Sequence, residues 1–323
     1  MKKIRMLSAA MCCAILLTAC SRQEPTEQQS EPLVSTSGES SQQTNSSDIS
    51  STSSSDSVEV SVPRVETLCT AYALYCIEDD VMLDSYEADK RIAPASLTKM
   101  LTASVVLKYL DLDDVVTVGS ELQFVNEDSS LCWIAEGQRL TVNDLLYGLL
   151  LPSGNDAAYT LAVNTARRVR SDPNMSDRNA VAYFCRLMNQ MARELGMTGS
   201  HFADPDGWDD PDHYTTVSDL IKIAKYSLTI PEIREIIATP IIEVEFETGE
   251  YALWYNSNLL LWEDSEYYNE YAIGMKNGAT DDAGYCMIAV FEKNNKTYLD
   301  IVMGSEEIED RYEKIAQLFD EIP

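Results

Sequence analysis

The chain has 323 residues and a formal net charge of −29 at pH 7, with 53 acidic against 24 basic side chains. Nearly all of this negative charge lies beyond residue 62, and such a surface repels phosphate backbones and anionic lipid headgroups. The charge balance therefore excludes a nucleic-acid partner, but it does not identify a substrate.

The first twenty residues have the pattern of a secretory signal. Three basic residues among the first five precede a mostly apolar run, residues 6–17, which is too short to span a bilayer. The run leads into Leu17-Thr18-Ala19-Cys20, which is typical of a bacterial lipobox. We therefore expect Cys20 to be lipidated and the chain to be extracytoplasmic, anchored to the outer face of the bacterial cytoplasmic membrane. The alternative is an ordinary signal peptide that ends near a cysteine.

Residues 21–62 are predicted to be a disordered tether. Between Ser35 and Ser57, twelve of 23 residues are serine, and most of the others are polar. Such a stretch buries too little apolar surface to offset the entropy lost on ordering. We expect the folded part to occupy residues 63–323, a length that suits one large domain or two closely joined lobes.

The folded part is predicted to begin with a β-hairpin. Residues 68–79 and 81–86 mix apolar and aromatic side chains, with an acidic turn between them. A helix over 95–110 follows, because its apolar residues recur at helical spacing and Pro94 stands at its start. Further helices are predicted over residues 141–151, 156–169, 180–195 and 220–228, with Thr141 as the cap of the first.

The C-terminal part is predicted to return to strands. These are expected over residues 241–246, 273–276, 284–291 and 297–303, with Asn294-Asn295 turning the last pair. A helix over 306–319 closes the chain. Strands thus occur at both ends and helices fill the middle. This order predicts an α/β (α+β) fold, in which an antiparallel sheet from both termini is flanked by helices and carries an inserted helical lobe.

Five cysteines remain in the folded part once the signal and Cys20 are set aside. They are Cys69, Cys76, Cys132, Cys185 and Cys286. None lies in a Cys-x-x-Cys or other metal-binding spacing. We expect each to be a small buried hydrophobic side chain, and we leave open one disulfide whose partners cannot be assigned.

Ser96 and Lys99 are three residues apart on the predicted helix 95–110, so their side chains share a face. In the first turn the backbone N–H of Ser96 lacks a helical partner and can help form an oxyanion hole. Lys99 can take the Ser96 proton if burial or a second cation keeps it neutral. This pair alone is a weak signal. Two polar clusters add to it: Ser153-Gly154-Asn155 between two helices, and Lys276-Asn277-Gly278 at the end of a strand.

Together these motifs resemble the Ser-x-x-Lys, Ser-x-Asn and Lys-Thr-Gly set of penicillin-recognising serine peptidases. Residues 93–100, 151–158 and 274–280 are similar to the D-Ala-D-Ala carboxypeptidase branch, the low-molecular-weight penicillin-binding proteins. The resemblance runs in order over residues 65–319. It implies a β-lactamase/transpeptidase-like fold without cofactor or metal. It also implies peptidoglycan stem peptides ending in D-Ala-D-Ala as substrates and β-lactam antibiotics as inhibitors.

The resemblance implies a catalytic role for each matching position. Ser96 is the nucleophile that becomes acylated, and Lys99 is its general base. Ser153 relays a proton to the leaving D-alanine, while Asn155 holds the substrate amide and Lys99. The backbone N–H groups of Ser96 and Ala279 form the oxyanion hole.

The resemblance also implies a site for the substrate's terminal carboxylate. Lys276 supplies positive potential there, Gly278 lets the substrate backbone lie close, and Arg311 corresponds to a further arginine of the family. The chain departs from the family at Asn277, where the pattern has a threonine. The asparagine amide also donates hydrogen bonds but is longer, so we expect a lower turnover. Relatives often carry a C-terminal β-domain and anchor. We expect the N-terminal lipid to replace them in tethering this chain.

Other features of the sequence favour structural roles. His201 and His213 are the only histidines, and each is expected to be a surface or loop residue, since no Gly-x-Ser-x-Gly or His-Glu-x-x-His motif is present. Five aspartates between residues 204 and 212 lack the spacing of an EF-hand, so a solvated loop is expected.

Two other functions remain as alternatives. A class A β-lactamase shares the three motifs but needs a Glu-x-x-Leu-Asn pattern, which is missing after Asn155. A non-catalytic wall-binding module is the other alternative, in which Asn277 would mark decay of the site.

Overall fold

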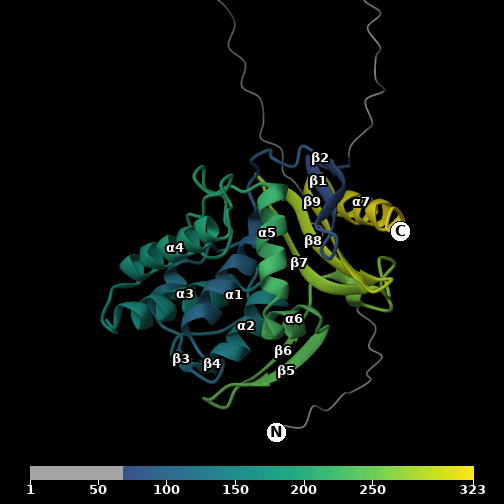
Figure 1. The fold of residues 1–323 in the computed structure, drawn as a ribbon. Coiled ribbons are helices and arrows are strands. Elements are labelled where there is room, and N and C mark those ends of the chain that lie inside the picture. Colours follow the sequence, from purple (N-terminus) through teal and green to yellow (C-terminus); the bar gives the residue numbers. More distant parts are fainter. Residues whose placement is uncertain (1–67) are drawn as a thin grey trace, which may run out of the picture. The chain divides into compact units, whose positions relative to one another are not determined.

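The computed structural model describes residues 68–323 (Figure 1). The expected signal, residues 1–20, and the expected tether, residues 21–62, lie outside the described residues, as does the expected lipidation site Cys20. The boundary expected at residue 63 also precedes the first described residue. No helix within residues 68–323 is both long and apolar enough to cross a membrane.

Five antiparallel strands form the main sheet, in the order β2-β1-β9-β8-β7. Their bounds are β1 Ala71–Cys76, β2 Val81–Tyr86, β7 Ala272–Thr280, β8 Gly284–Lys293 and β9 Lys296–Ser305. Strand β1 pairs with β9, so the two ends of the described chain meet in one sheet. Asn294 and Asn295, with φ of +53° and +61°, form the two-residue turn between β8 and β9. The predicted antiparallel sheet from both termini is confirmed.

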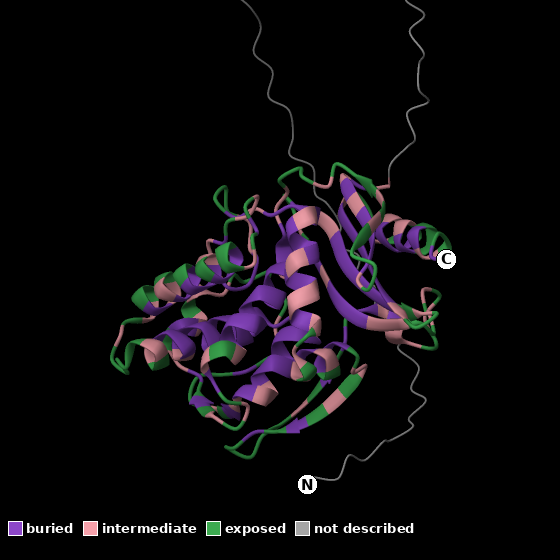
Figure 2. Ribbon diagram, viewed as in Figure 1, coloured by how far each residue is buried: buried purple, intermediate pink, exposed green. Residues whose placement is uncertain are grey.

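Both faces of the sheet are covered, which explains why β8 and β9 are nearly continuous apolar runs. In β8, Met287 and Phe291 belong to the cluster that packs against α7 (Ile308–Asp320). Ile288 and Val290 point to the opposite face and join the main core with the other helices, since strand side chains alternate with period two. The centre of the sheet is accordingly buried along its length (Figure 2).

Six helices lie between β2 and β7 in the chain. They are α1 Thr98–Tyr109, α2 Val142–Leu150, α3 Asn155–Arg170, α4 Asp177–Glu194, α5 Val217–Leu228 and α6 Pro231–Ile237. Helix α1 is central, because it is buried continuously from Thr98 to Val106 and contacts α2, α3, α4 and α5. A helix buried on all sides is normally apolar throughout. The polar residues of α1 therefore need partners from neighbouring segments.

The inserted helical lobe and Thr141 as the cap of α2 are confirmed. The predicted strand 241–246 is observed as β5 (Ile241–Glu245). It does not join the main sheet but pairs with β6 (Tyr251–Tyr255), which was not predicted, in a separate hairpin with one exposed face. Helix α6, which starts at Pro231, was not predicted. Strand β7 continues beyond residue 276 to Thr280, so Lys276 lies within the strand. A short pair, β3 (Val115–Thr117) and β4 (Arg139–Thr141), completes the strands.

The five cysteines of the described chain are all buried and free. Four of them pack within the two apolar clusters, and the Cys185 thiol donates to the carbonyl of Ala203 at 3.1 Å. Burial raises the pKa of the Cys286 thiol to about 12, which keeps it protonated and unreactive. The expectation of small buried hydrophobic side chains is confirmed, and no disulfide joins these cysteines.

Candidate active site

The motif Ser96-Leu97-Thr98-Lys99 spans the junction between a 3-10 turn (Ala95–Leu97) and helix α1. Lys99 is fully buried, and its Nζ donates to Ser96 Oγ at 2.7 Å, to Asn155 Oδ1 at 2.7 Å and to the Asp206 carbonyl at 2.8 Å. The structure thus brings Ser96, Lys99 and Asn155 together, although Asn155 lies 56 positions after Lys99 in the chain.

Burial lowers the pKa of Lys99 from 10.5 to about 8, against the opposing charges of Asp206, Asp204 and Asp156. Desolvation disfavours the charged form of an amine. The Asp206 carboxyl is itself fully buried, and neither of its oxygens has a partner among the described residues. Its burial, with the nearby Asp204 charge, raises its pKa well above the usual range.

Strand β7 lies directly against the backbone of Ser96. A Cβ built on Gly278 would stand 2.6 Å from the Ser96 nitrogen, so only glycine permits this approach. The next residue, Ala279, lines a cavity of about 530 Å³ together with Trp208, Thr280 and Tyr285. The end of strand β7, directly after the residue that packs against Ser96, therefore borders an open space.

Ser153 lies in the loop between α2 and α3. Its backbone has φ of +65°, and Ala95, which precedes Ser96, has φ of +48°. Such conformations cost about 1–3 kcal/mol for residues other than glycine and gather at functional sites. The Ser153 hydroxyl is buried without a hydrogen-bond partner among the described residues. It is therefore free to bond a ligand or a neighbouring hydroxyl that reorients.

Two further basic side chains are buried close to this site, one on strand β7 and one on helix α7. Lys276 is buried, and its Nζ donates to the Asn277 carbonyl at 2.9 Å. Burial, followed by the charges of Lys99 and Arg311, holds the Lys276 pKa well below its usual range. Arg311, on α7, is buried and donates to the carbonyl of Cys286 at 3.3 Å, the residue that faces Gly278 across the β7–β8 pair. An anion bound beside Lys276 would counter this shift and favour the charged form of the lysine.

Asn277 is tied to a neighbouring segment. Its Oδ1 accepts from the Ser257 hydroxyl and its Nδ2 donates to the Ser257 carbonyl, both at 2.8 Å. The Ser257 nitrogen in turn donates to the carbonyl of Leu151 at 3.0 Å, two residues before Ser153. Asn277 thus links β7 to the loop that carries Ser153.

Residues 204–213 correct one of our sequence expectations and refine another. His213 lies in a loop, as expected, but it is 2% exposed there and bonds Asp204 and Thr98, each at 2.9 Å. Asp206 was expected in a solvated loop and is buried instead. His201 is exposed, as expected. Among residues 68–323, no group of histidine, cysteine, aspartate and glutamate is placed to hold a metal ion.

This arrangement places the Ser96 hydroxyl beside the fully buried amine of Lys99, whose pKa is lowered. It adds the Ser153 hydroxyl, which has no partner among the described residues, and the buried basic side chains of Lys276 and Arg311. These are the components of nucleophilic acyl transfer.

Comparison with known proteins points the same way. A family model described as D-alanyl-D-alanine carboxypeptidase matches residues 69–307. The D-alanyl-D-alanine carboxypeptidase of Streptomyces sp. (strain K15) is 34% identical over 237 residues, which are 68% of this chain and 75% of that protein. The carboxypeptidase DacC of Escherichia coli (strain K12) is 30% identical, over 80% of this chain and 62% of its own length.

Solved structures share the fold. The Streptomyces K15 DD-transpeptidase superposes with a TM-score of 0.72 at 30% identity, covering 79% of this chain and 96% of that one. Penicillin-binding protein D2 from Listeria monocytogenes, in its ampicillin-bound form, gives 0.65 at 28% identity, covering 80% of this chain and 99% of that one. The predicted fold class is confirmed.

Proposed function

This chain belongs to the D-alanyl-D-alanine carboxypeptidase family of serine peptidases, and on that premise we propose how its own residues release the terminal D-alanine of peptidoglycan stem peptides. The observation that carries the proposal is the contact of Lys99 Nζ with Ser96 Oγ at 2.7 Å, in a fully buried position. Such a pair provides a nucleophile and its base without a histidine.

In the acylation step, Ser96 Oγ attacks the carbonyl carbon of the penultimate D-alanine, and Lys99 takes the hydroxyl proton. The backbone N–H groups of Ser96 and Ala279 stabilise the oxyanion. The C–N bond then breaks as Ser153 gives its hydroxyl proton to the leaving amine and takes up the proton that Lys99 holds, so Lys99 is neutral again and an ester remains on Ser96. Lys99 then removes a proton from water, the hydroxide displaces Ser96 Oγ from the ester, and Lys99 returns the proton to Ser96. A β-lactam enters the same step, but its opened ring stays attached as an ester.

The substrate's terminal carboxylate is bound on the other side of the reacting carbonyl. The carboxylate favours the charged form of Lys276, so that Lys276 and Arg311 supply the positive potential, and Gly278 leaves room for the substrate backbone beside Ser96. Asn277 replaces the threonine of the family pattern, and its amide is engaged by Ser257. We therefore expect a functional but slow enzyme.

The location of the protein is part of the same proposal. A basic start, a short apolar run and Leu17-Thr18-Ala19-Cys20 support export and lipidation at Cys20. The serine-rich residues 35–57 support a flexible spacer. The catalytic part would then act on the wall from the outer face of the cytoplasmic membrane, as a lipoprotein.

The test is mass spectrometry of the soluble domain after treatment with penicillin. The wild-type domain should gain the mass of one drug molecule, and Ser96→Ala should gain none. The same pair of proteins should differ in D-alanine release from a peptide ending in D-Ala-D-Ala. A wild-type domain that neither gains mass at high drug concentration nor releases D-alanine would overturn the proposal in favour of a non-catalytic wall-binding module.

A further inference from the structure

The three partners of Lys99 determine the direction of its lone pair. The Asp206 carbonyl and Asn155 Oδ1 are acceptors only, so each must receive an N–H of Lys99. A neutral amine has two N–H groups and one lone pair. Once both N–H groups are used, the lone pair points at the third partner, Ser96 Oγ, 2.7 Å away. The Asp206 carbonyl is therefore one of two groups that aim the base at the nucleophile.

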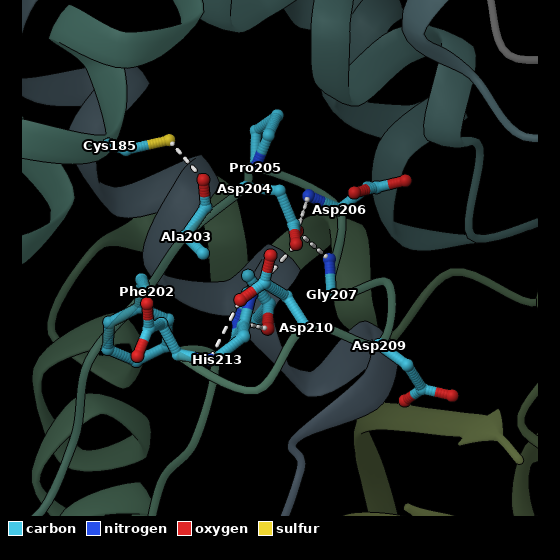
Figure 3. Close-up of polar contacts among 12 residues, drawn as sticks. Cys185, Phe202, Ala203, Asp204, Pro205, Asp206, Gly207, Asp209, Asp210 and His213 are labelled. Carbon is cyan, nitrogen blue, oxygen red and sulfur yellow. Dashed lines mark hydrogen bonds and ion pairs between the residues drawn. The ribbon is translucent and has the colours of Figure 1, made fainter. Parts of the chain in front are cut away.

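The Asp206 carbonyl is held in place by its own loop. Asp204 Oδ1 accepts from the backbone nitrogens of Asp206 at 3.1 Å and Gly207 at 2.6 Å. Figure 3 shows this carboxylate among the backbone atoms of the loop. Thr102 of α1 donates to the Pro205 carbonyl at 2.7 Å. The Gly207 N–H belongs to the same peptide unit as the Asp206 carbonyl, while the Asp206 N–H and the Pro205 carbonyl belong to the unit before it. These bonds therefore fix the peptide unit that faces Lys99 and the preceding one.

His213 connects this loop to the start of α1. Its Nδ1 lies 2.9 Å from Asp204 Oδ2 and its Nε2 lies 2.9 Å from Thr98 Oγ1. Since the carboxylate is an acceptor, Nδ1 carries the hydrogen, and in the neutral ring Nε2 accepts from the Thr98 hydroxyl. The ring is buried against the edge of Phe202. Thr98 precedes Lys99, so His213 joins the loop to the helical turn that presents the base.

This hydroxyl–imidazole–carboxylate chain resembles a catalytic triad only in its connections. Thr98 is 1% exposed, and its hydroxyl faces the loop at Gly207, where an added Cβ would lie 2.9 Å from Oγ1. No substrate carbonyl can reach that oxygen. The chain therefore supports the site next to it and is not a second nucleophile.

We propose that Asp204 and His213 are positioning residues for the reaction, because they hold the Asp206 carbonyl on Lys99 Nζ and so direct the lone pair of the base to Ser96 Oγ. This inference rests on the proposed function. It adds two residues, of which one is the only buried histidine among residues 68–323.

The test is stopped-flow acylation by a penicillin, which separates the noncovalent dissociation constant from the acylation rate constant. In His213→Ala the rate constant should fall by about a hundredfold, the effect of misplacing a reacting group by roughly 1 Å. The dissociation constant should stay unchanged. His213→Asn keeps a donor toward Asp204 and should recover part of the rate. His201→Ala removes the exposed histidine of the same region and should acylate like the wild type.

A second pair of variants covers the case in which His213→Ala does not fold. Thr98→Val removes the hydroxyl and should be slow, and Thr98→Ser restores it and should be faster than the valine variant. Wild-type rate constants in both His213→Ala and Thr98→Val would overturn the inference. An equal loss in binding and rate, with no recovery by asparagine or serine, would also overturn it by showing general structural damage. Failure of the wild type to acylate would instead refute the proposed function.

Discussion

Replacing Asn277 with threonine restores the family pattern at the one motif position where this chain departs from it. The Asn277 amide bonds Ser257 twice, at 2.8 Å each. Its polar atoms are thus engaged by the segment that supports Ser153. A threonine side chain is too short to make both bonds to Ser257. Its hydroxyl is therefore available to the substrate carboxylate beside Lys276.

The size of the effect follows from the bonds exchanged. A hydrogen bond to a charged group contributes about 1.5–3 kcal/mol, and each 1.4 kcal/mol corresponds to a factor of ten in rate, if the bond tightens in the transition state. We therefore expect Asn277→Thr to accelerate acylation roughly ten- to hundredfold. The two bonds to Ser257 are lost at a partly exposed position, so the free energy of unfolding should fall by only about 1–2 kcal/mol.

The assay is single-turnover acylation of both proteins at one pH, using a peptide that ends in D-Ala-D-Ala. The same peptide with its terminal carboxylate amidated is the control. The gain should vanish with the amide, because the new hydroxyl then has no charged partner. A clear drop in the threonine variant would refute the slow-enzyme reasoning and show that Asn277 is matched to a different substrate end.

Lys99→Arg should not acylate at any accessible pH, because arginine stays charged; near-normal acylation, followed by intact mass, would make Lys99 merely structural. In the wild type, the acylation rate should rise as the pH increases through about 8, the pKa of Lys99, because the neutral amine is the base; a pH profile that is flat there would contradict this role. Gly207→Ala should lower the free energy of unfolding, measured in urea, by about 2–4 kcal/mol. Gly207 has φ of +92°, and an added Cβ would lie 1.9 Å from the Ala95 carbonyl oxygen; an unchanged unfolding midpoint would show that the loop moves freely. Cys20→Ser should move the full chain from the membrane fraction to the soluble fraction, and unchanged retention on an immunoblot would reject the lipobox.

The sequence predicted the fold well where one local pattern decides the structure. The apolar runs of β8 and β9 and the helical spacing in α1 each follow from burial of a continuous element. The sheet to which strand 241–246 belongs could not be predicted, because an alternating strand has the same pattern whether its covered face meets the main sheet or another surface. Strand β7 was ended too early, since Asn277 and Gly278 are weak strand formers that packing against Ser96 overrides.

The candidate site was only partly predictable for a related reason. Ser96 and Lys99 are neighbours on one helix, so their spacing carries the signal. His213 contacts Thr98 across 115 positions of the chain, and no local pattern marks a buried histidine in an aspartate-rich loop. A signal for the burial of this loop was available in residues 202–207, because Gly207 permits the loop to approach Ala95 closely. Burial of polar loops depends on tertiary contacts that a single sequence does not display.

Strand β7 is an outer strand of its sheet, and a free strand edge invites other chains to pair with it. The turn that carries Ser96 covers the face of this strand at Gly278 and also contacts β8, so it leaves the edge itself unpaired. The unpaired backbone groups of such an edge are the ones to which an extended peptide can bond. Under the proposed function, a stem peptide that adds itself to β7 lies beside Ser96, and the edge that invites self-association is also the place where the substrate is admitted.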